Sequence, residues 1–390
     1  MNFSRLTEYL DGLENKYGVP GFDIRICRDH EEIYRHMGGH SDHAKTVPVG
    51  GNELYNIYSA SKVITMTAAM QLIEKGILGL DDPVAEYLPE FRQMQVADHF
   101  DFGVYPPVIP TMDDPHHPAK TPITIRMLMS MTAGLNYDVE SAPIRELREA
   151  TGGKATTRQM MGAIAKMPLL YEPGTRYLYS LGHDVIAGVI EVVSGMTFGE
   201  YLKKNIFDPL QLTDMYLLPD AAQISRLNAQ FINEPDSEKI VPTKLVNRYR
   251  LSDCYESGGA GISCSVKDYS TFIDALACGG VGWNGERVLT PEGIRQLSEN
   301  QLSPEILPDF QSPWQKAYGY ALGVRTLIHP ELSPTPLGEF GWDGAAGAYA
   351  LIDPVNHISV FYVQEVLNMV RVYAEIHPAV RNLIYAGLKE

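Results

Sequence analysis

A serine and a lysine three residues apart are the first residues of this chain that could do chemistry together. The segment Ser59-Ala-Ser-Lys62 has the form S-x-x-K and opens a helical pattern over residues 59–75. Residues three apart share one face of a helix, so Lys62 could take the proton of the Ser59 hydroxyl. The pair indicates a serine nucleophile, although a helix N-terminal serine beside a solvent-facing lysine has the same pattern.

A tyrosine on a predicted loop is the second candidate. Pro173-Gly174 predicts a turn, a helical stretch follows over 184–193, and Tyr179 lies between them. A phenol acts as a general base when a nearby ammonium group lowers its pKa. Tyr179 could therefore share proton transfer with Lys62, or it could be a packing tyrosine.

Glycines crowd a third segment, Gly341-Trp-Asp-Gly344 and the residues up to Gly347, just before an apolar strand pattern. A glycine-rich strand lets a substrate backbone approach closely and exposes N–H groups to it. The segment is a candidate substrate-binding edge, although a β-bulge or a plain sheet edge has the same composition.

The elements that must position these residues are strands near both ends of the chain and helices between them. The N-terminal segment reads helix, strand, strand, which suits an antiparallel sheet with a helix on one face. Residues 92–120 are rich in proline and lack a period, so they predict a long loop, and 220–255 is irregular. The expected helices are 3–17, 59–75, 122–130, 157–166, 182–206, 266–279, 290–300 and 369–387, and the expected strands are 22–27, 32–35, 318–325, 346–352 and 358–363.

The composition excludes several classes of protein. Of 390 residues, 45% are hydrophobic and 21% are charged, an ordinary balance for a folded chain. The net charge of −16 and the lack of Lys/Arg runs argue against a nucleic-acid partner. No stretch approaches the ~18 apolar residues of a membrane span. The N-terminus lacks the apolar core of a secretory signal, so a cytoplasmic location is expected, while the oligomeric state stays open.

Metal and disulfide chemistry is not expected. The four cysteines are scattered without a C-x-x-C pair, which is typical of core thiols: Cys27, Cys254, Cys264 and Cys278. His116-His117 follows Asp113-Asp114 in the proline-rich stretch, but a solvated loop explains them better than a metal site. We therefore predict no metal ion.

Several landmarks in a fixed order resemble those of the serine β-lactamase and penicillin-binding-protein family, and within it the class C-like esterases, carboxypeptidases and acyltransferases. The resemblance covers nearly the whole chain, and several landmarks in order are more specific than any one. Besides Ser59-Ala-Ser-Lys62 and the glycine-rich segment, they are Gly18-Val-Pro-Gly21, Leu80-Asp-Asp-Pro83 with Tyr87-Leu-Pro89, Ile123-Thr-Ile-Arg-Met-Leu128 with Thr132-Ala-Gly-Leu135, Pro173-Gly-Thr175 with Tyr179-Ser180, and Ser257-Gly-Gly-Ala-Gly261.

The resemblance implies an α/β (α+β) fold of the β-lactamase/transpeptidase type, with an antiparallel sheet flanked by helices and an inserted helical subdomain. One catalytic unit would span 1–390. Residues 1–60 and 256–390 would form the sheet part and residues 61–255 the mainly helical part. The active site would lie in the groove between them.

By the same resemblance, Ser59 is the acylated nucleophile, Lys62 is its base or proton relay, and Tyr179 is the tyrosine of the second motif. The backbone N–H groups of Ser59 and Ala345 would form the oxyanion hole, and such donors are typically worth ~3 kcal/mol each. The mechanism needs no metal or organic cofactor.

The expected substrate contacts are Leu181, Trp342, Asp343 and Gly344. Two of these depart from the motifs of β-lactamases. Leu181 stands where an Asn amide would bind the substrate, and Trp342 stands where a Lys would hold the carboxylate of a penicillin. The nearest candidates in sequence for a replacement cation are Arg176, Arg248 and Arg250.

These features predict a carboxylesterase-like serine hydrolase whose partner is a small-molecule ester, amide or peptide substrate. The same acyl-enzyme could serve a D-amino-acid peptidase, a weak β-lactamase or an acyltransferase. A catalytically silent scaffold on this fold is the alternative from another class, and the intact Ser59, Lys62 and Tyr179 count against it.

Overall fold

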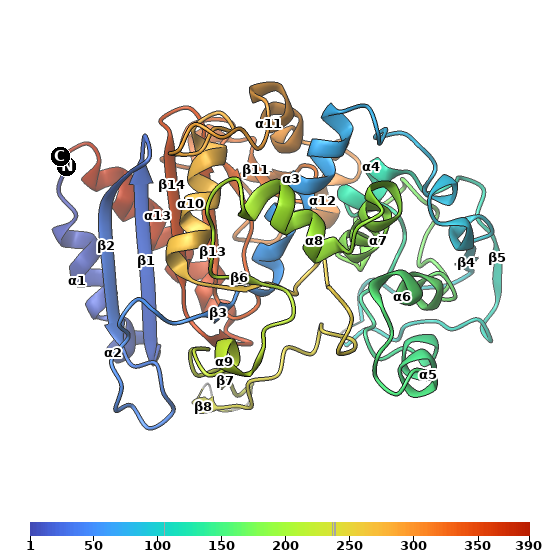
Figure 1. The fold of residues 1–390 in the computed structure, drawn as a ribbon, viewed down its shortest axis with the longest axis horizontal. Coiled ribbons are helices and arrows are strands. Elements are labelled where there is room, and N and C mark those ends of the chain that lie inside the picture. Colours follow the sequence, from blue (N-terminus) through green and yellow to red (C-terminus); the bar gives the residue numbers. More distant parts are fainter. Residues whose placement is uncertain (105, 236, 238) are drawn as a thin grey trace.

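A seven-stranded antiparallel sheet and a group of helices beside it make up the fold (Figure 1). The computed structural model describes residues 1–104, 106–235, 237 and 239–390. The strand order β10-β11-β12-β13-β14-β1-β2 joins the two ends of the chain, because β1 pairs with both β14 and β2. The strands are β1 Gly21–Arg28, β2 Glu31–Gly39, β10 Tyr318–Tyr320, β11 Arg325–Leu327, β12 Phe340–Gly341, β13 Tyr349–Asp353 and β14 Ile358–Val363.

Alternating side chains give the sheet two apolar faces. Along β13, Ala350 joins the larger core and Leu351 joins the smaller one, because successive residues of a strand point to opposite faces. The larger core packs against α10 (Val266–Ala277), whose Tyr269 stacks on Phe361 with ring centroids 4.1 Å apart. The smaller core lies beneath the terminal helices α1 (Ser4–Asp11), α2 (Leu13–Tyr17) and α13 (His377–Gly387).

The helix α3 (Ser61–Glu74) runs through the larger core and carries the lysine of the S-x-x-K segment. Every residue from Ser61 to Leu72 is buried, which excludes a solvent-facing Lys62. The α-helix begins later than the sequence predicts, because Ser59 lies in a 3-10 turn over Tyr58–Ala60 that precedes it. The nucleophile candidate therefore stands on a tight turn at the head of a buried helix.

The helical part beside the sheet contains α4 to α8. The predicted helix over 182–206 is interrupted, because Gly195 with φ +68° ends α7 and a Thr197 capping box starts α8. The helices here are α4 Ile125–Met129, α5 Ala142–Ala150, α6 Thr157–Ile164, α7 Gly182–Ser194 and α8 Phe198–Leu202, with a π-helical turn at Lys203–Phe207.

Two further predictions differ from the structure. Residues 318–325 are not one strand, because a turn with Gly323 at φ +87° separates β10 from β11. The stretch 92–120 is not wholly irregular, since β4 (Gln95–Ala97) and β5 (His116–Pro118) pair antiparallel within it. Tyr105 of that stretch lies outside the described residues.

Smaller elements complete the chain. The closing segment begins with a π-helical turn at Val372–Ile376 before α13. The remaining helices are α9 Ala221–Ile224, α11 Pro291–Ser298 and α12 Leu307–Phe310, and the remaining strands are β3 Tyr55–Asn56, β6 Met215–Tyr216, β7 Phe231–Asn233, β8 Ile240–Pro242, β9 Ser263–Cys264 and β15 Val366–Leu367.

Within the described parts of the chain, no single helix has the length and apolar character needed to cross a membrane. One pair of helices, Gly182–Ser194 with Phe198–Phe207, is together long and apolar enough, but the two helices are bent by 76° relative to each other.

Candidate active site

Ser59 is half-buried on the 3-10 turn before α3. The residue before it, Tyr58, has φ +46°, a left-handed conformation that is rare for a bulky side chain. A hydrogen bond of 2.6 Å from Gln230 Nε2 to the Tyr58 hydroxyl holds the turn in this conformation. Among the described residues, no protein acceptor takes the backbone N–H of Ser59. The turn thus presents both a hydroxyl and a free N–H.

The Lys62 side chain is fully buried and lies between the nucleophile and a carbonyl group. Its Nζ donates to Gly259 O at 2.7 Å, and it lies 3.3 Å from Ser59 Oγ and 3.4 Å from the Tyr137 hydroxyl. Burial lowers the pKa of Lys62 to about 7, while the negative charge of Asp184 acts to raise it. A large share of the amine is therefore neutral at neutral pH and able to accept a proton.

Two tyrosine rings enclose the Lys62 amine. Its Nζ is 4.6 Å from the ring centroid of Tyr179 and 5.5 Å from that of Tyr137. The two rings stack on each other with centroids 5.4 Å apart and planes 18° apart. Cation–π attraction partly replaces water around the charged form of the lysine. The rings thus exclude solvent from the amine and do not place a negative charge beside it.

The phenol of Tyr179 reaches the serine from the loop that precedes α7. Trp342 Nε1 donates a hydrogen bond of 3.1 Å to its oxygen. Burial raises the pKa of Tyr179 above its ordinary value, and hydrogen bonds with Ser59 and Trp342 act to lower it. The phenol is therefore neutral in the free protein, while Lys62 is the group whose pKa suits a base at neutral pH.

The glycine-rich segment after β12 packs directly against the turn that carries the serine. A Cβ atom added to Gly344 would lie 2.2 Å from Ile57 O, so only glycine permits this approach. Tyr373 donates a hydrogen bond of 2.9 Å to Gly344 O and fixes the segment from the other side. The backbone N–H of Ala345 finds no protein acceptor in the described ranges. Two free N–H groups, those of Ser59 and Ala345, therefore belong to segments in contact.

Asp343 and Leu181 are engaged elsewhere. Asp343 accepts a hydrogen bond of 2.8 Å from the buried Arg325. Leu181 caps α7 within the larger core and is 2% exposed. Neither observation supports a substrate contact, so for both residues that role stays a prediction.

The three arginines proposed as replacement cations have partners of their own. Arg176 pairs with Asp309 at 2.6 Å, and Arg250 donates to Gly261 O at 2.9 Å. Arg248 donates to the hydroxyl of its neighbour Tyr249 at 3.1 Å and remains exposed. Only the Arg248 contact leads toward the site, through the aromatic contact of Tyr249 with Tyr137.

Two groups beside Lys62 had no signal in the sequence. Tyr137 follows the landmark that ends at Leu135, but one tyrosine among 22 draws no notice. Asp184 is 1% exposed in the first turn of α7. It accepts hydrogen bonds from the segment that carries the carbonyl partner of Lys62, namely from Tyr255 Oη at 2.7 Å, Ser257 Oγ at 2.7 Å and Gly259 N at 3.2 Å.

Known proteins are similar to this chain in sequence or in fold. A family model described as beta-lactamase matches residues 6–378. The acyltransferase calJ of Penicillium decumbens is 28% identical over 368 residues, which cover 88% of this chain and 83% of calJ. Esterase EstB of Burkholderia gladioli is 28% identical over 380 residues, which cover 92% of this chain and 88% of EstB. The solved structure of EstCE1, a hydrolase with promiscuous acyltransferase activity, has the same fold, with a TM-score of 0.76, 23% identity and 98% coverage of both chains.

Proposed function

Because the chain belongs to the beta-lactamase family, we propose that it is a serine hydrolase that forms an acyl-enzyme on Ser59 and cleaves small carboxylic esters. The observation that carries the proposal is the buried Lys62 amine, 3.3 Å from Ser59 Oγ with its pKa lowered to about 7. Burying an amine destabilises the folded protein, and groups with such shifted pKa values are concentrated at functional sites. Accepting the proton of Ser59 is a function that explains this one. The relatives calJ and EstB, named as an acyltransferase and an esterase, support the same chemistry.

In acylation, Ser59 Oγ attacks the ester carbonyl carbon while its proton passes to neutral Lys62. The carbonyl oxygen becomes an oxyanion that receives hydrogen bonds from the N–H groups of Ser59 and Ala345. The carbon–oxygen bond to the alcohol then breaks, and the alkoxide takes the proton from Lys62 through the Tyr179 hydroxyl. The contacts of Tyr179 with both Ser59 and Trp342 support this relay role.

In deacylation, a water molecule takes the place of the alcohol, and the steps run in the opposite order. It gives one proton to Lys62 through Tyr179 and attacks the acyl carbon, and the bond to Ser59 Oγ breaks as that oxygen regains a proton. The products are the carboxylic acid and the free enzyme. An alcohol in place of water would give acyl transfer, and the likeness to the acyltransferase calJ favours this second candidate function. Peptidase activity, a silent scaffold and the cytoplasmic location stay predictions from the sequence.

We expect a substrate with an uncharged acyl group to react faster than one with an anionic acyl group. Trp342 occupies the position at which β-lactamases hold a carboxylate, and its ring stacks on Tyr179 with centroids 5.7 Å apart. Losing one partner of a desolvated charge pair typically costs ~2–5 kcal/mol. We therefore expect kcat/KM for p-nitrophenyl butyrate to exceed that for nitrocefin by at least ~100-fold. Equal values for the two substrates would replace the esterase proposal with a β-lactamase one.

The nucleophile is tested with a fluorophosphonate probe and a Ser59→Ala variant. Wild type should be labelled on the peptide that contains Ser59, and Ser59→Ala should lose both labelling and hydrolysis while its melting temperature stays close to wild type. Ser225→Ala, at an exposed serine whose hydroxyl donates to Ala222 O, is the control and should keep both. Near wild-type turnover by Ser59→Ala would show that another group is the nucleophile.

A further inference from the structure

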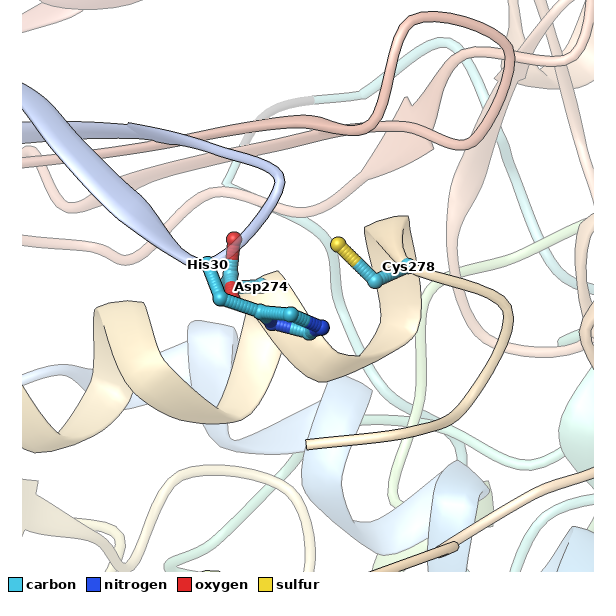
Figure 2. Close-up of side chains that lie close together, drawn as sticks. All are labelled: His30, Asp274 and Cys278. Atoms are coloured by element: carbon cyan, nitrogen blue, oxygen red, sulfur yellow. The ribbon is translucent and has the colours of Figure 1, made fainter. Parts of the chain in front are cut away.

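Three side chains that the proposed reaction does not use meet at the edge of the large sheet. His30 lies in the turn between β1 and β2, Asp274 is on α10, and Cys278 caps the C-terminal end of that helix. Figure 2 shows the three side chains lying close together where the hairpin passes over the helix. One ligand atom from each residue lies within 4.8 Å of the other two. Asp274 and Cys278 are four residues apart, so they share one face of α10.

The polar groups of this cluster are only partly satisfied by one another. His30 Nδ1 and Asp274 Oδ2 form a hydrogen bond of 2.7 Å. The Asp274 residue is 4% exposed, and its other oxygen, Oδ1, is buried with no hydrogen-bond partner among the described residues. A buried carboxylate oxygen without a donor is unfavourable and calls for an explanation. A cation bound by the carboxylate would provide one.

The backbone fixes the histidine in place before any ligand arrives. Asp29 and His30 have φ values of +51° and +70°, the left-handed pair that a two-residue hairpin favours. The Asp29 N–H also donates to His357 O at 3.1 Å, which holds the turn against the neighbouring strand connection. The hairpin therefore presents the His30 ring to α10 without needing to rearrange.

A cavity that opens to solvent lies beside the cluster, and charged residues line it. A cavity of about 380 Å³ borders it, lined by His30 and Asp274 and by the 55% exposed Trp283. Two cations also line this cavity: Arg25, which pairs with Glu32 at 2.8 Å, and Lys267, an exposed residue of α10. A metal ion can thus reach the cluster from solvent.

We propose that His30, Asp274 and Cys278 form a binding site for Zn²⁺ or a similar transition-metal ion. Nitrogen, oxygen and sulfur donors together suit Zn²⁺, whereas Mg²⁺ and Ca²⁺ take oxygen ligands. On binding, the thiol proton of Cys278 would be released to solvent, the His30 nitrogen that holds the ion would carry no proton, and water would fill the fourth position. The site shares no residue with the Ser59 centre, and a bound ion would tie the hairpin to α10.

The test removes bound metal from the full chain with a chelator and then measures Zn²⁺ binding by titration calorimetry. We expect one Zn²⁺ per chain and a melting temperature that rises with Zn²⁺ concentration. Cys278→Ser and Asp274→Asn should each weaken Zn²⁺ affinity by more than ~100-fold, since the loss of even an outer partner typically costs 10–100-fold. Cys254→Ser removes an exposed cysteine elsewhere and is the matched control.

Co²⁺ gives an independent readout. The Co²⁺-loaded wild type should show a thiolate-to-metal charge-transfer band that Cys278→Ser lacks and Cys254→Ser keeps. The melting temperature of each metal-free variant reports that it is folded, and ester hydrolysis, measured separately, should not change, so failure of the metal site is separate from failure of the proposed enzyme. The site is wrong if the wild type takes up no Zn²⁺, or if Cys254→Ser and Cys278→Ser bind Zn²⁺ and Co²⁺ alike.

Discussion

At the scale of the residue, the chemistry depends on an amine that has lost its water but has no carboxylate in contact. Lys62 Nζ contacts one carbonyl oxygen, two hydroxyl groups and two aromatic faces. Asp184 stands behind Gly259 and acts on Lys62 only through its field. Burial thus makes the amine a base, because its desolvation outweighs the field of Asp184.

The first prediction is that the titration of Lys62 alone controls how kcat/KM falls as the pH is lowered. The pKa of Lys62 is lowered to about 7, so falling pH protonates it and removes the base. We expect kcat/KM for p-nitrophenyl acetate to rise about tenfold per pH unit below pH 7 and to level above it. A profile that is flat between about pH 5 and pH 9 would remove Lys62 from the role of base.

The second prediction separates charge from hydrogen bonding at Asp184. Asp184→Asn removes the negative charge that raises the pKa of Lys62, so the midpoint of the pH–rate profile should move to lower pH. Tyr255→Phe is the control, because it removes one hydrogen bond to Asp184 and leaves the charge. It should lower the plateau at most. If both variants keep the wild-type midpoint, Asp184 has only a structural role.

At the scale of the element, two segments remote in sequence must touch for the site to exist. The 3-10 turn that carries Ser59 contacts the segment after β12 through Gly344, whose missing Cβ allows the backbone to lie against Ile57 O. Each of the two segments carries one of the free N–H groups, that of Ser59 on the turn and that of Ala345 after β12. The spacing of the proposed oxyanion hole is therefore set by backbone packing.

The third prediction concerns that contact. In Gly344→Ala the added methyl group, 2.2 Å from Ile57 O, must push the two segments apart. Misplacement of about 1 Å can cost ~100-fold in rate, so we expect at least that loss in kcat/KM for an ester. The control is Gly162→Ala in α6, where an added Cβ meets nothing within 4 Å. Full ester activity in Gly344→Ala would contradict the proposed role of the Ser59 and Ala345 N–H groups.

At the scale of the whole molecule, the sheet separates two cores with different tasks. The larger core encloses α3 and surrounds the site, while the smaller core lies beneath the terminal helices on the opposite face. Strands from both ends of the chain build the sheet, so the smaller core also locks the first residues to the last. Stability and catalysis can therefore be perturbed separately.

The fourth prediction uses this separation. Leu10 of α1 is fully buried in the smaller core, and Leu10→Ala should lower the free energy of unfolding by about 2–5 kcal/mol. Urea unfolding measures the loss, and kcat/KM for an ester in the absence of urea should stay at the wild-type value. A parallel loss of activity would mean that the two cores are coupled through the sheet.

The sequence by itself was sufficient for features that depend on near neighbours or on a fixed order of landmarks. The S-x-x-K spacing, the main strands and helices, and the beta-lactamase family all follow from such local patterns. Local pattern failed where a backbone turn interrupts an apolar run, as at Gly195 and Gly323, because periodicity does not register a left-handed residue. It also placed Ser59 inside the α-helix, although the helix begins only at Ser61.

Only the tertiary structure decided which distant residues meet. The carbonyl partner of Lys62 is Gly259, 197 positions away, and His30 and Asp274 are 244 positions apart. The first contact arises because β3 pairs with β9, which brings the Gly259 segment beside α3, and the second because α10 packs on the sheet that the two chain ends form. No local pattern encodes them, since each of these residues alone fits an ordinary core or surface position.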